Sequence, residues 1–480
     1  MDEQVFSFFG EEGDLAKIGW CGEEKPALWR YNQHYFDDLT SSNAAKHEVG
    51  HRAILEKWYQ DNPKGTGIGW DPYPTSLRVV NWIKYSLSGG ELTPLLLASL
   101  GNQIEWLSDR IERHLLGNHI LANAKALYFG GCFFSGDKPG LWLKKARAIF
   151  EAQFREQVLR DGGHFELSPM YHSVILEDLL DLINIARAYG YEEDTRYWEE
   201  ISYKMFGWLE CMCHPDGRFS FFNDAAFGVA AEKNELLLYA ARLGLPEVEQ
   251  ANKSRYLAES GYVRLENQSA VLVCDIGNVG PDYIPGHAHA DTLSFEMSVY
   301  GHRLFVNSGT SEYGVSAERS RQRETRAHNT VSVNGQDSSE VWGGFRVGRR
   351  ARPLYPKVCI DSEVQEVVCS HDGFGTRLRP YIHRRAWLLS RDSLVIKDEV
   401  SGSPNSCESF FYCHPDIKVL DEGGLLKLTL PDQRSIFMEV VGGNAMVARS
   451  SWHPSFGASL SSHMIHIEFE SNESQVTLKF

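Results

Sequence analysis

Two short histidine-containing segments hold the residues best suited to chemistry in this chain. Residues 286–291 read GHAHAD, and residues 327–330 read AHNT. Side chains two residues apart share one face of an extended strand, so a strand here would bring the imidazoles of His287 and His289 together. With a third histidine from a neighbouring strand, the pair predicts a divalent-metal site or a site that handles protons.

The residue types around these segments suggest a division of roles. His289 and His328 are of the type that binds metals, and Asn307 could add an oxygen ligand. His287 would then be left to face a substrate. The alternative is that the histidines are hydrogen-bonded core residues, although two neighbouring imidazoles rarely both find satisfied core positions.

Two motifs in the first half of the chain add further candidates. Asn118 and His119 precede a helical run, where Asn118 could cap the helix or both residues could contact a substrate carboxylate. In residues 161–172, the Ser168-Pro169 pair predicts a helix start. Tyr171 follows it as either a core tyrosine or a proton-transfer group. A phenol of ordinary pKa, about 10, is a poor base at neutral pH unless positive groups lower that pKa.

The elements that must position these residues change in kind along the chain. Apolar residues at three- and four-residue spacing predict helices, which favours a helical bundle, solenoid or closed toroid. Short apolar or alternating runs after residue 260 predict an antiparallel sandwich or barrel. The predicted helices are 95–116, 141–159, 174–189, 193–212 and 225–243, and the predicted strands are 270–274, 293–299, 330–333, 386–395, 427–430, 465–469 and 475–480.

Length and charge limit the classes of function. A chain of 480 residues predicts two or three domains, and a net charge of −16 argues against nucleic-acid binding. No apolar run is long enough for a membrane span. The first residues lack a secretory signal, so we expect a cytoplasmic protein, or a periplasmic or secreted one if a leader was removed. The sequence gives no prediction of oligomeric state.

Local positive charge opposes the overall charge. Residues 345–352 form the densest basic run, and four arginines between 319 and 326 precede His328. These arginines either lie on solvated faces or line a cationic groove for an acidic ligand.

In this order and spacing, the motifs resemble those of the heparinase II/III-like polysaccharide lyases. The resemblance also covers residues 70–74 (WDPYP) with Arg78, Asn81 and Trp82, and residues 342–346 (WGGFR). It implies an α+β multidomain protein with an (α/α) toroid at 1–250 and an antiparallel β-sandwich at 251–480. The implied reaction is β-elimination on a uronic acid of an acidic polysaccharide, which needs carboxylate neutralisation, a base at C5 and an acid at the leaving oxygen.

Residue by residue, the resemblance implies the following roles. Asn118 and His119 match the pair that contacts the carboxylate, Tyr171 matches the catalytic tyrosine, and His287 matches the histidine that faces the substrate. Tyr313 lies where relatives place a second catalytic tyrosine. Glu166, Arg346, Arg350 and Trp70 are predicted substrate contacts.

The resemblance also implies a structural zinc ion held by His289, His328 and the residue at position 307. Relatives usually have aspartate there, whereas this chain has Asn307, a poorer ligand that brings no negative charge.

Two other classes of function remain open from the sequence. The first is a glycoside hydrolase with paired carboxylates, for which Glu166, Asp224 and Asp291 are the available acids. The second is a non-catalytic, glycan-binding member of the family, which the weakened metal position favours.

Overall fold

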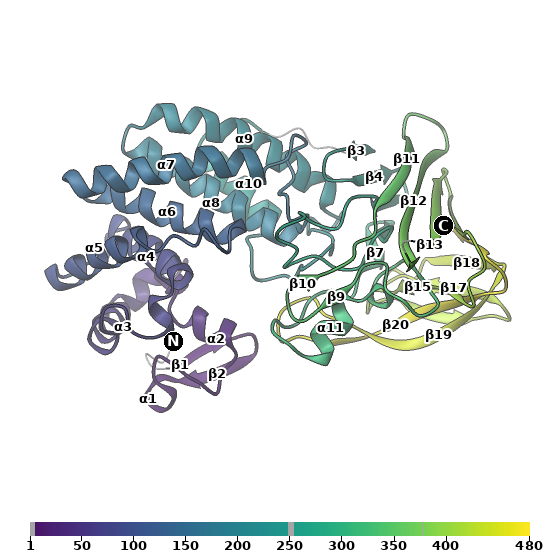
Figure 1. Cartoon of the computed structure of the whole chain (residues 1–480), viewed down its shortest axis with the longest axis horizontal. Helices are drawn as coiled ribbons and strands as arrows, with labels where there is room; N and C mark the ends of the chain where they lie inside the picture. Colours follow the sequence, from purple (N-terminus) through teal and green to yellow (C-terminus); the bar gives the residue numbers. More distant parts are fainter. Residues whose placement is uncertain (1–4, 248–253, 377) are drawn as a thin grey trace. The chain divides into compact units, whose positions relative to one another are not determined.

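The computed structural model describes residues 5–247, 254–376 and 378–480 (Figure 1). The chain divides into two compact units. The first comprises residues up to 157 together with 178–200, and the second comprises 158–177 and 201–480. The long helices α8 (Pro169–Ala188) and α9 (Glu192–Met212) contribute residues to both units.

Helices dominate the first unit. Proline in the first turn starts two of them, where its missing N–H costs nothing, and Thr93 caps α5 by accepting a hydrogen bond from the Leu96 N–H. Besides the hairpin β1 (Val5–Phe8) and β2 (Glu11–Asp14), the elements are α1 (Leu15–Ile18), α2 (Ala27–Asn32), η1 (Asp37–Thr40), η2 (Ala44–His47), α3 (Glu48–Asp61), η3 (Ile68–Trp70), α4 (Pro72–Leu87), α5 (Pro94–Ser108), α6 (Gly117–Phe133) and α7 (Asp137–Gln157).

A buried ion cluster joins three of these helices. Lys125 of α6 donates to Asp178 at 2.6 Å and to Asp181 at 2.5 Å, both on α8, and Lys84 of α4 also reaches Asp181 at 2.5 Å. Burial alone would raise the pKa of Asp181, but the two ammonium groups hold it well below its ordinary value. The cluster therefore fixes α8 against α4 and α6 within the first unit.

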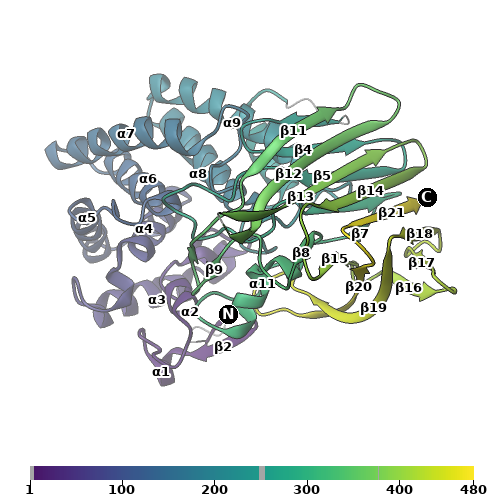
Figure 2. The same cartoon turned by 45° about the vertical axis from the view of Figure 1, so that its right-hand side comes forward.

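Antiparallel sheets make up most of the second unit (Figure 2). Their strand orders are β3-β4-β5-β6-β7, β11-β12-β13-β14-β21-β18-β17-β16 and β19-β20-β15-β8, with a separate hairpin β9-β10. Leu272, Trp387 and Ile465, one from each large sheet, belong to a single apolar core.

The bounds of the elements in this unit, besides α8 and α9, are α10 (Lys233–Arg242), β3 (Arg255–Leu257), β4 (Tyr262–Glu266), β5 (Ala270–Asp275), β6 (Phe295–Val299), β7 (His302–Phe305), α11 (Ala317–Arg323), η4 (Thr325–Ala327), β8 (Val331–Val333), β9 (Val341–Trp342), β10 (Arg346–Val347), β11 (Pro353–Cys359), β12 (Gln365–Thr376), β13 (Arg379–Leu389), β14 (Ser393–Val400), β15 (Cys407–Tyr412), β16 (Lys418–Asp421), β17 (Leu425–Thr429), β18 (Ser435–Val441), β19 (Gly443–Trp452), β20 (Leu460–Phe469) and β21 (Glu473–Lys479).

The predicted order of helices followed by strands is confirmed, with three corrections. The helix expected at 95–116 ends at Ser108. The helix expected at 225–243 begins only at Lys233, since Phe227 bonds to the backbone of Pro454 instead of continuing a helix. The strand expected at 386–395 is the end of β13, a turn and the start of β14.

The change from helix to strand falls between Arg242 and Arg255. The domain boundary predicted at residue 250 lies in 248–253, outside the described residues. No helix in the described part of the chain combines the length and apolar composition that a membrane crossing needs.

Candidate functional site

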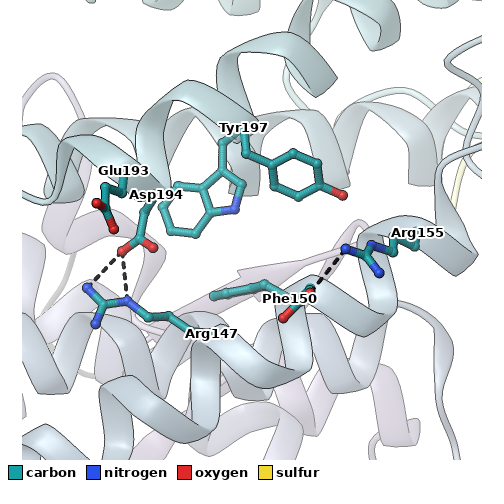
Figure 3. A pocket seen from close by; sticks show the side chains of 8 residues that line it. Arg147, Phe150, Arg155, Glu193, Asp194 and Tyr197 are labelled. Carbon is teal, nitrogen blue, oxygen red and sulfur yellow. Dashed lines mark hydrogen bonds and ion pairs between the residues drawn. The ribbon is translucent and has the colours of Figure 1, made fainter.

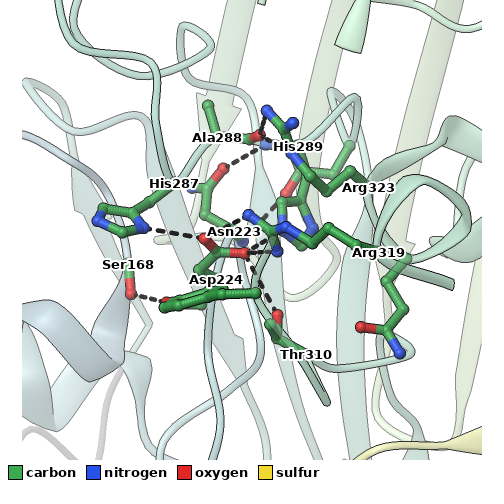
Figure 4. Close-up of polar contacts among 12 residues, drawn as sticks. Ser168, Asn223, Asp224, His287, Ala288, His289, Thr310, Arg319 and Arg323 are labelled. Atoms are coloured by element: carbon green, nitrogen blue, oxygen red, sulfur yellow. Dashed lines mark hydrogen bonds and ion pairs between the residues drawn. The ribbon is translucent and has the colours of Figure 1, made fainter. Parts of the chain in front are cut away.

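A buried carboxylate, Asp224, is the centre of the polar cluster in the second unit (Figure 4). Its two oxygens lie 2.9 Å from His287 Nδ1 and 2.8 Å from His289 Nε2. Both terminal nitrogens of Arg319 also donate to it, one of them at 2.8 Å. Burial would raise the pKa of Asp224, but Arg319 and the histidine hydrogen bonds hold it well below its ordinary value. Asp224 is therefore ionised and paired.

Local backbone geometry places this carboxylate. Asn223 adopts a left-handed conformation with φ of 57°, which asparagine tolerates better than most residues. Its side chain donates to the Leu167 carbonyl at 2.9 Å and accepts from the His289 N–H at 3.1 Å. The Asp224 N–H in turn donates to the His287 carbonyl. Residues 223–224 are thus fixed against the histidine segment by backbone contacts.

The histidine segment itself is a loop. We expected a strand at residues 286–291, but they lie between β5 and β6 without strand structure, which corrects the prediction. His287 and His289 still converge, because both imidazoles bond to opposite oxygens of Asp224. The shared Asp224 carboxylate, and not the face of a strand, brings the two imidazoles together.

Two tyrosines stand beside His287. The Tyr171 ring stacks on the imidazole with 3.9 Å between centroids, and the Tyr171 hydroxyl lies 2.9 Å from the Tyr313 hydroxyl. Burial and the charge of Asp224 raise the pKa of Tyr313 well above its ordinary value. Tyr313 therefore remains protonated and can donate within this pair.

The start of α8 positions Tyr171, as the Ser168-Pro169 motif predicted. Ser168 Oγ accepts from the Tyr171 N–H at 3.2 Å and donates to the Asp224 carbonyl at 2.5 Å. One hydroxyl thus ties the tyrosine to the carboxylate segment. The buried Glu166 lies just before, with Oε2 3.5 Å from His287 Nε2. His287 therefore lies between two carboxyl groups.

The other predicted catalytic pair belongs to the first unit. Because α6 begins at Gly117, Asn118 and His119 lie within its first turn, and Asn118 is not the N-cap. The Asn118 amide lies 3.5 Å from the Tyr73 hydroxyl. The His119 ring contacts the Tyr73 ring in a tilted arrangement, with 4.4 Å between centroids, and His119 Nδ1 lies 3.3 Å from a Glu112 oxygen. The side chains form one polar cluster at this helix end.

Three predicted substrate contacts differ in their surroundings. Trp70 is buried, with its indole N–H donating to the Asn62 carbonyl and its ring against Trp106, so it packs the core instead of offering a face to a sugar. Arg350 donates to the carbonyls of Pro281 and Asp282, which gives it a structural role. Arg346 is exposed.

Of the three predicted zinc ligands, Asn307 is the one that does not fit a metal ion. His289 Nδ1 lies 3.3 Å from His328 Nε2, a distance that suits either a hydrogen bond between the rings or two nitrogen ligands of one zinc ion. The Asn307 amide donates to the Phe221 carbonyl at 2.7 Å and accepts from the Asn329 N–H at 3.3 Å, so its atoms are committed to backbone.

Among the described residues, one group of three ligand-type side chains does come together. It consists of Glu408, His466 and Glu468 on β15 and β20. Arg326 already lies 3.2 Å from Glu408 and neutralises part of its charge.

A separate pocket in the first unit contains none of the predicted site residues (Figure 3). It lies between α7 and α9, where Arg147 pairs with Asp194 and Arg155 pairs with Glu151. Its other lining residues are Phe150, Glu193, Tyr197 and Trp198.

Sequence reasoning missed two residues of the central cluster. Asp224 was considered only as a hydrolase acid, and Arg319 only as one of several basic residues. Neither has a local motif that would reveal its partner, because 95 residues separate the two. The structure brings a tyrosine and a histidine together in front of a buried, ionised carboxylate, and side chains of these types are suited to proton transfer.

Comparison with known proteins identifies the family. A model described as the heparinase II/III N-terminus matches residues 40–242, and one described as heparinase II/III-like, C-terminal, matches residues 249–479. The chain belongs to the heparinase II/III-like family.

Individual relatives agree with this assignment. A heparin-sulfate lyase of Bacteroides stercoris is 26% identical over 321 residues, covering 62% of this chain and 46% of that protein. One from Pedobacter heparinus is 23% identical over 372 residues, covering 69% and 56%. The chain spans about half the length of these curated relatives. A crystal structure of heparinase III shares the fold, with a TM-score of 0.76 at 17% identity, over 94% of this chain and 75% of that one.

Proposed function

We propose that the protein is a polysaccharide lyase that cleaves a uronic-acid-containing acidic polysaccharide by β-elimination. The observation that carries the proposal is the stack of Tyr171 on His287 with Asp224 behind it, in a chain of this family. In this reaction a base takes the C5 proton, the C4–O4 bond breaks, its electrons leave with O4, and a C4–C5 double bond forms. An acid protonates the departing oxygen.

The tautomer of His287 follows from its partner. Asp224 is ionised and accepts the Nδ1–H, so Nε2, which lies 3.5 Å from Glu166 Oε2, is the nitrogen that can exchange a proton with a ligand. Tyr171, paired through its hydroxyl with the protonated Tyr313, supplies the acid at O4 and acts as the base for one uronate stereochemistry. Asp224 and Arg319 act through His287 and are positioning residues.

Stabilising the uronate carboxylate is the remaining task. Removal of the C5 proton places negative charge on that carboxylate, and hydrogen-bond donors fixed beforehand lower the barrier. We assign this role to Asn118 and His119 of the first unit, on their match to the family motif and their polar side chains. The finer architecture we propose is an (α/α) toroid for the helices and a β-sandwich for the sheets.

Hydrolysis by paired carboxylates has less support. Asp224 is bound by an arginine and two histidines and cannot serve as a free acid or base. Asp291 is buried, which raises its pKa to about 6, and it accepts from the backbone N–H of Asn223. With Asp224 and Asp291 both bound to protein groups, Glu166 is the one candidate acid that remains, and this mechanism needs a pair of carboxyl groups.

Formation of the C4–C5 double bond tests the proposed reaction. The protein is incubated with heparan sulfate, the class of substrate in the relatives' names, and with other uronic-acid polymers, and ultraviolet absorbance of the unsaturated product is followed. We expect absorbance to rise with the wild type and not with Tyr171→Phe, whose thermal midpoint should stay near that of the wild type. Saturated products, or full activity of the folded variant, would refute the proposal.

A further inference from the structure

The hairpin β9-β10 presents unusual side chains to solvent. Trp342 is 51% exposed and Phe345 is 42% exposed. Trp342 and Arg346 face each other across the two strands, with the guanidinium 4.9 Å from the indole ring centre. Isolated exposed aromatic residues are common on proteins, so position and anchoring decide whether these have a function.

Two buried arginines hold this hairpin in place. Arg319 Nε donates to the Gly344 carbonyl at 3.1 Å, and Arg323 donates to the carbonyls of Gly343 at 3.0 Å and Arg346 at 3.2 Å. A Cβ on Gly344 would lie 2.4 Å from the Gly314 oxygen, so only glycine allows this approach. The hairpin is therefore a fixed support for its aromatic side chains.

The hairpin also adjoins the site described above. The Phe345 ring lies 5.3 Å from the Tyr313 ring and 6.2 Å from the His287 ring, between centroids. A ligand held by Tyr171 and His287 would meet Phe345 at the edge of that site. Aromatic faces are suited to the apolar C–H faces of pyranose rings, which pack on them while their hydroxyls stay in water.

The charge of Arg346 indicates that a sugar bound at the hairpin carries an anionic group. Arg350 and Arg352 pair with Asp282, but within the described residues no carboxylate pairs with Arg346. On a chain of net charge −16, binding of a polyanion needs local positive charge that is still available. A guanidinium held over an exposed indole lies beside any sugar ring that stacks on that indole, and it can contact an anionic group of that sugar.

We propose that the β9-β10 hairpin is a glycan subsite next to the uronate that is cleaved. Phe345 and Trp342 stack on neighbouring pyranose rings, and Arg346 contacts a carboxylate or sulfate of that sugar. This inference rests on the proposed lyase function. It adds Trp342 and Phe345 to the substrate contacts and gives the exposed Arg346 a defined partner.

Binding and cleavage are measured separately. Calorimetry with heparan sulfate tetrasaccharides uses the Tyr171→Phe protein, so that no turnover occurs, and each further change is made in that background. We expect Trp342→Ala and Phe345→Ala each to weaken binding about two- to tenfold, and Trp342→Phe to retain most of it. Tyr355→Ala, which removes an aromatic side chain 87% exposed on β11, is the matched control and should bind as the parent does.

Arg346→Gln tests the anionic contact. We expect weaker binding with a smaller dependence on salt, since one screened charge interaction is lost. A fully desulfated tetrasaccharide shows the source of the anion: if Arg346→Gln still weakens binding of this ligand, the partner is the carboxylate, and otherwise it is the sulfate.

The outcomes separate the two proposals. Affinity unchanged by Trp342→Ala and Phe345→Ala would overturn the subsite, and so would an equal loss in Tyr355→Ala. Binding that depends on Trp342, in a protein that forms no unsaturated product, would leave the subsite in place and reject the lyase function.

Discussion

Replacing Asp224 with asparagine tests whether this buried carboxylate positions His287 for catalysis. The change keeps the size of the side chain but leaves Arg319, itself fully buried, without its counter-ion. Removing one partner of a buried ion pair costs about 3–5 kcal/mol, because the other charge stays buried and uncompensated. Domains have total stabilities of about 5–15 kcal/mol, so the variant should still fold at low temperature and its kinetics can be measured.

The expected loss of activity has a different origin. Without the anionic acceptor, the Nδ1–H of His287 is no longer fixed, and Nε2 is no longer held as the exchanging nitrogen. General acid–base catalysis contributes about 10²–10⁴ in rate, so kcat of Asp224→Asn should fall by up to that factor. The assays are urea unfolding and initial rates of unsaturated product at saturating substrate.

A matched control exists in the same unit. Asp398 is also buried and pairs with Arg385 at 2.7 and 2.9 Å and with His383 at 2.8 Å. Asp398→Asn should lower stability by a similar amount while leaving kcat of the folded protein unchanged. If both variants lose kcat equally, or if Asp224→Asn keeps wild-type kcat, the assignment of Asp224 as the positioning residue of His287 is refuted.

Three further predictions concern ionic groups and metal binding. Lys125→Met should lower the free energy of unfolding, measured in urea, by about 3–5 kcal/mol, because it breaks a buried ion pair. Lys138→Met, which breaks an exposed pair, should lower it by less than about 1 kcal/mol. Equal losses would contradict a stabilising role of the buried ion cluster. Arg385 and His383 outweigh burial and lower the pKa of Asp398 to about 2, so its ionised form contributes about 2 kcal/mol above pH ~4. That contribution is lost as pH falls from about 4 to about 2, so the stability difference between wild type and Asp398→Asn should shrink over that range. A difference that stays constant would contradict the lowered pKa of Asp398. Chelation with EDTA should leave the thermal midpoint unchanged, whereas a drop reversed by zinc would show that the protein does bind an ion.

The sequence predicted the order of elements well because the helical and strand patterns are local. It also identified His287, His289 and Tyr171, whose side chains contact Asp224 directly or lie beside a histidine that does. It was wrong about the strand at the histidines, because spacing of two is typical of strands but does not require one. Asp224 could not be predicted as their common partner, since that depends on how residues 223–224 and 287–289 fold together.

One buried side chain links the proposed catalytic cluster to the proposed glycan subsite. Arg319 uses its terminal nitrogens on Asp224 and its Nε on the Gly344 carbonyl. The planar guanidinium makes both sets of bonds at once, which an ammonium group cannot do. The residue that keeps Asp224 ionised behind His287 therefore also fixes the hairpin that carries Phe345. A displacement of the hairpin would be transmitted to the carboxylate through one buried side chain, so the proposed sugar stacking and the orientation of His287 both depend on Arg319.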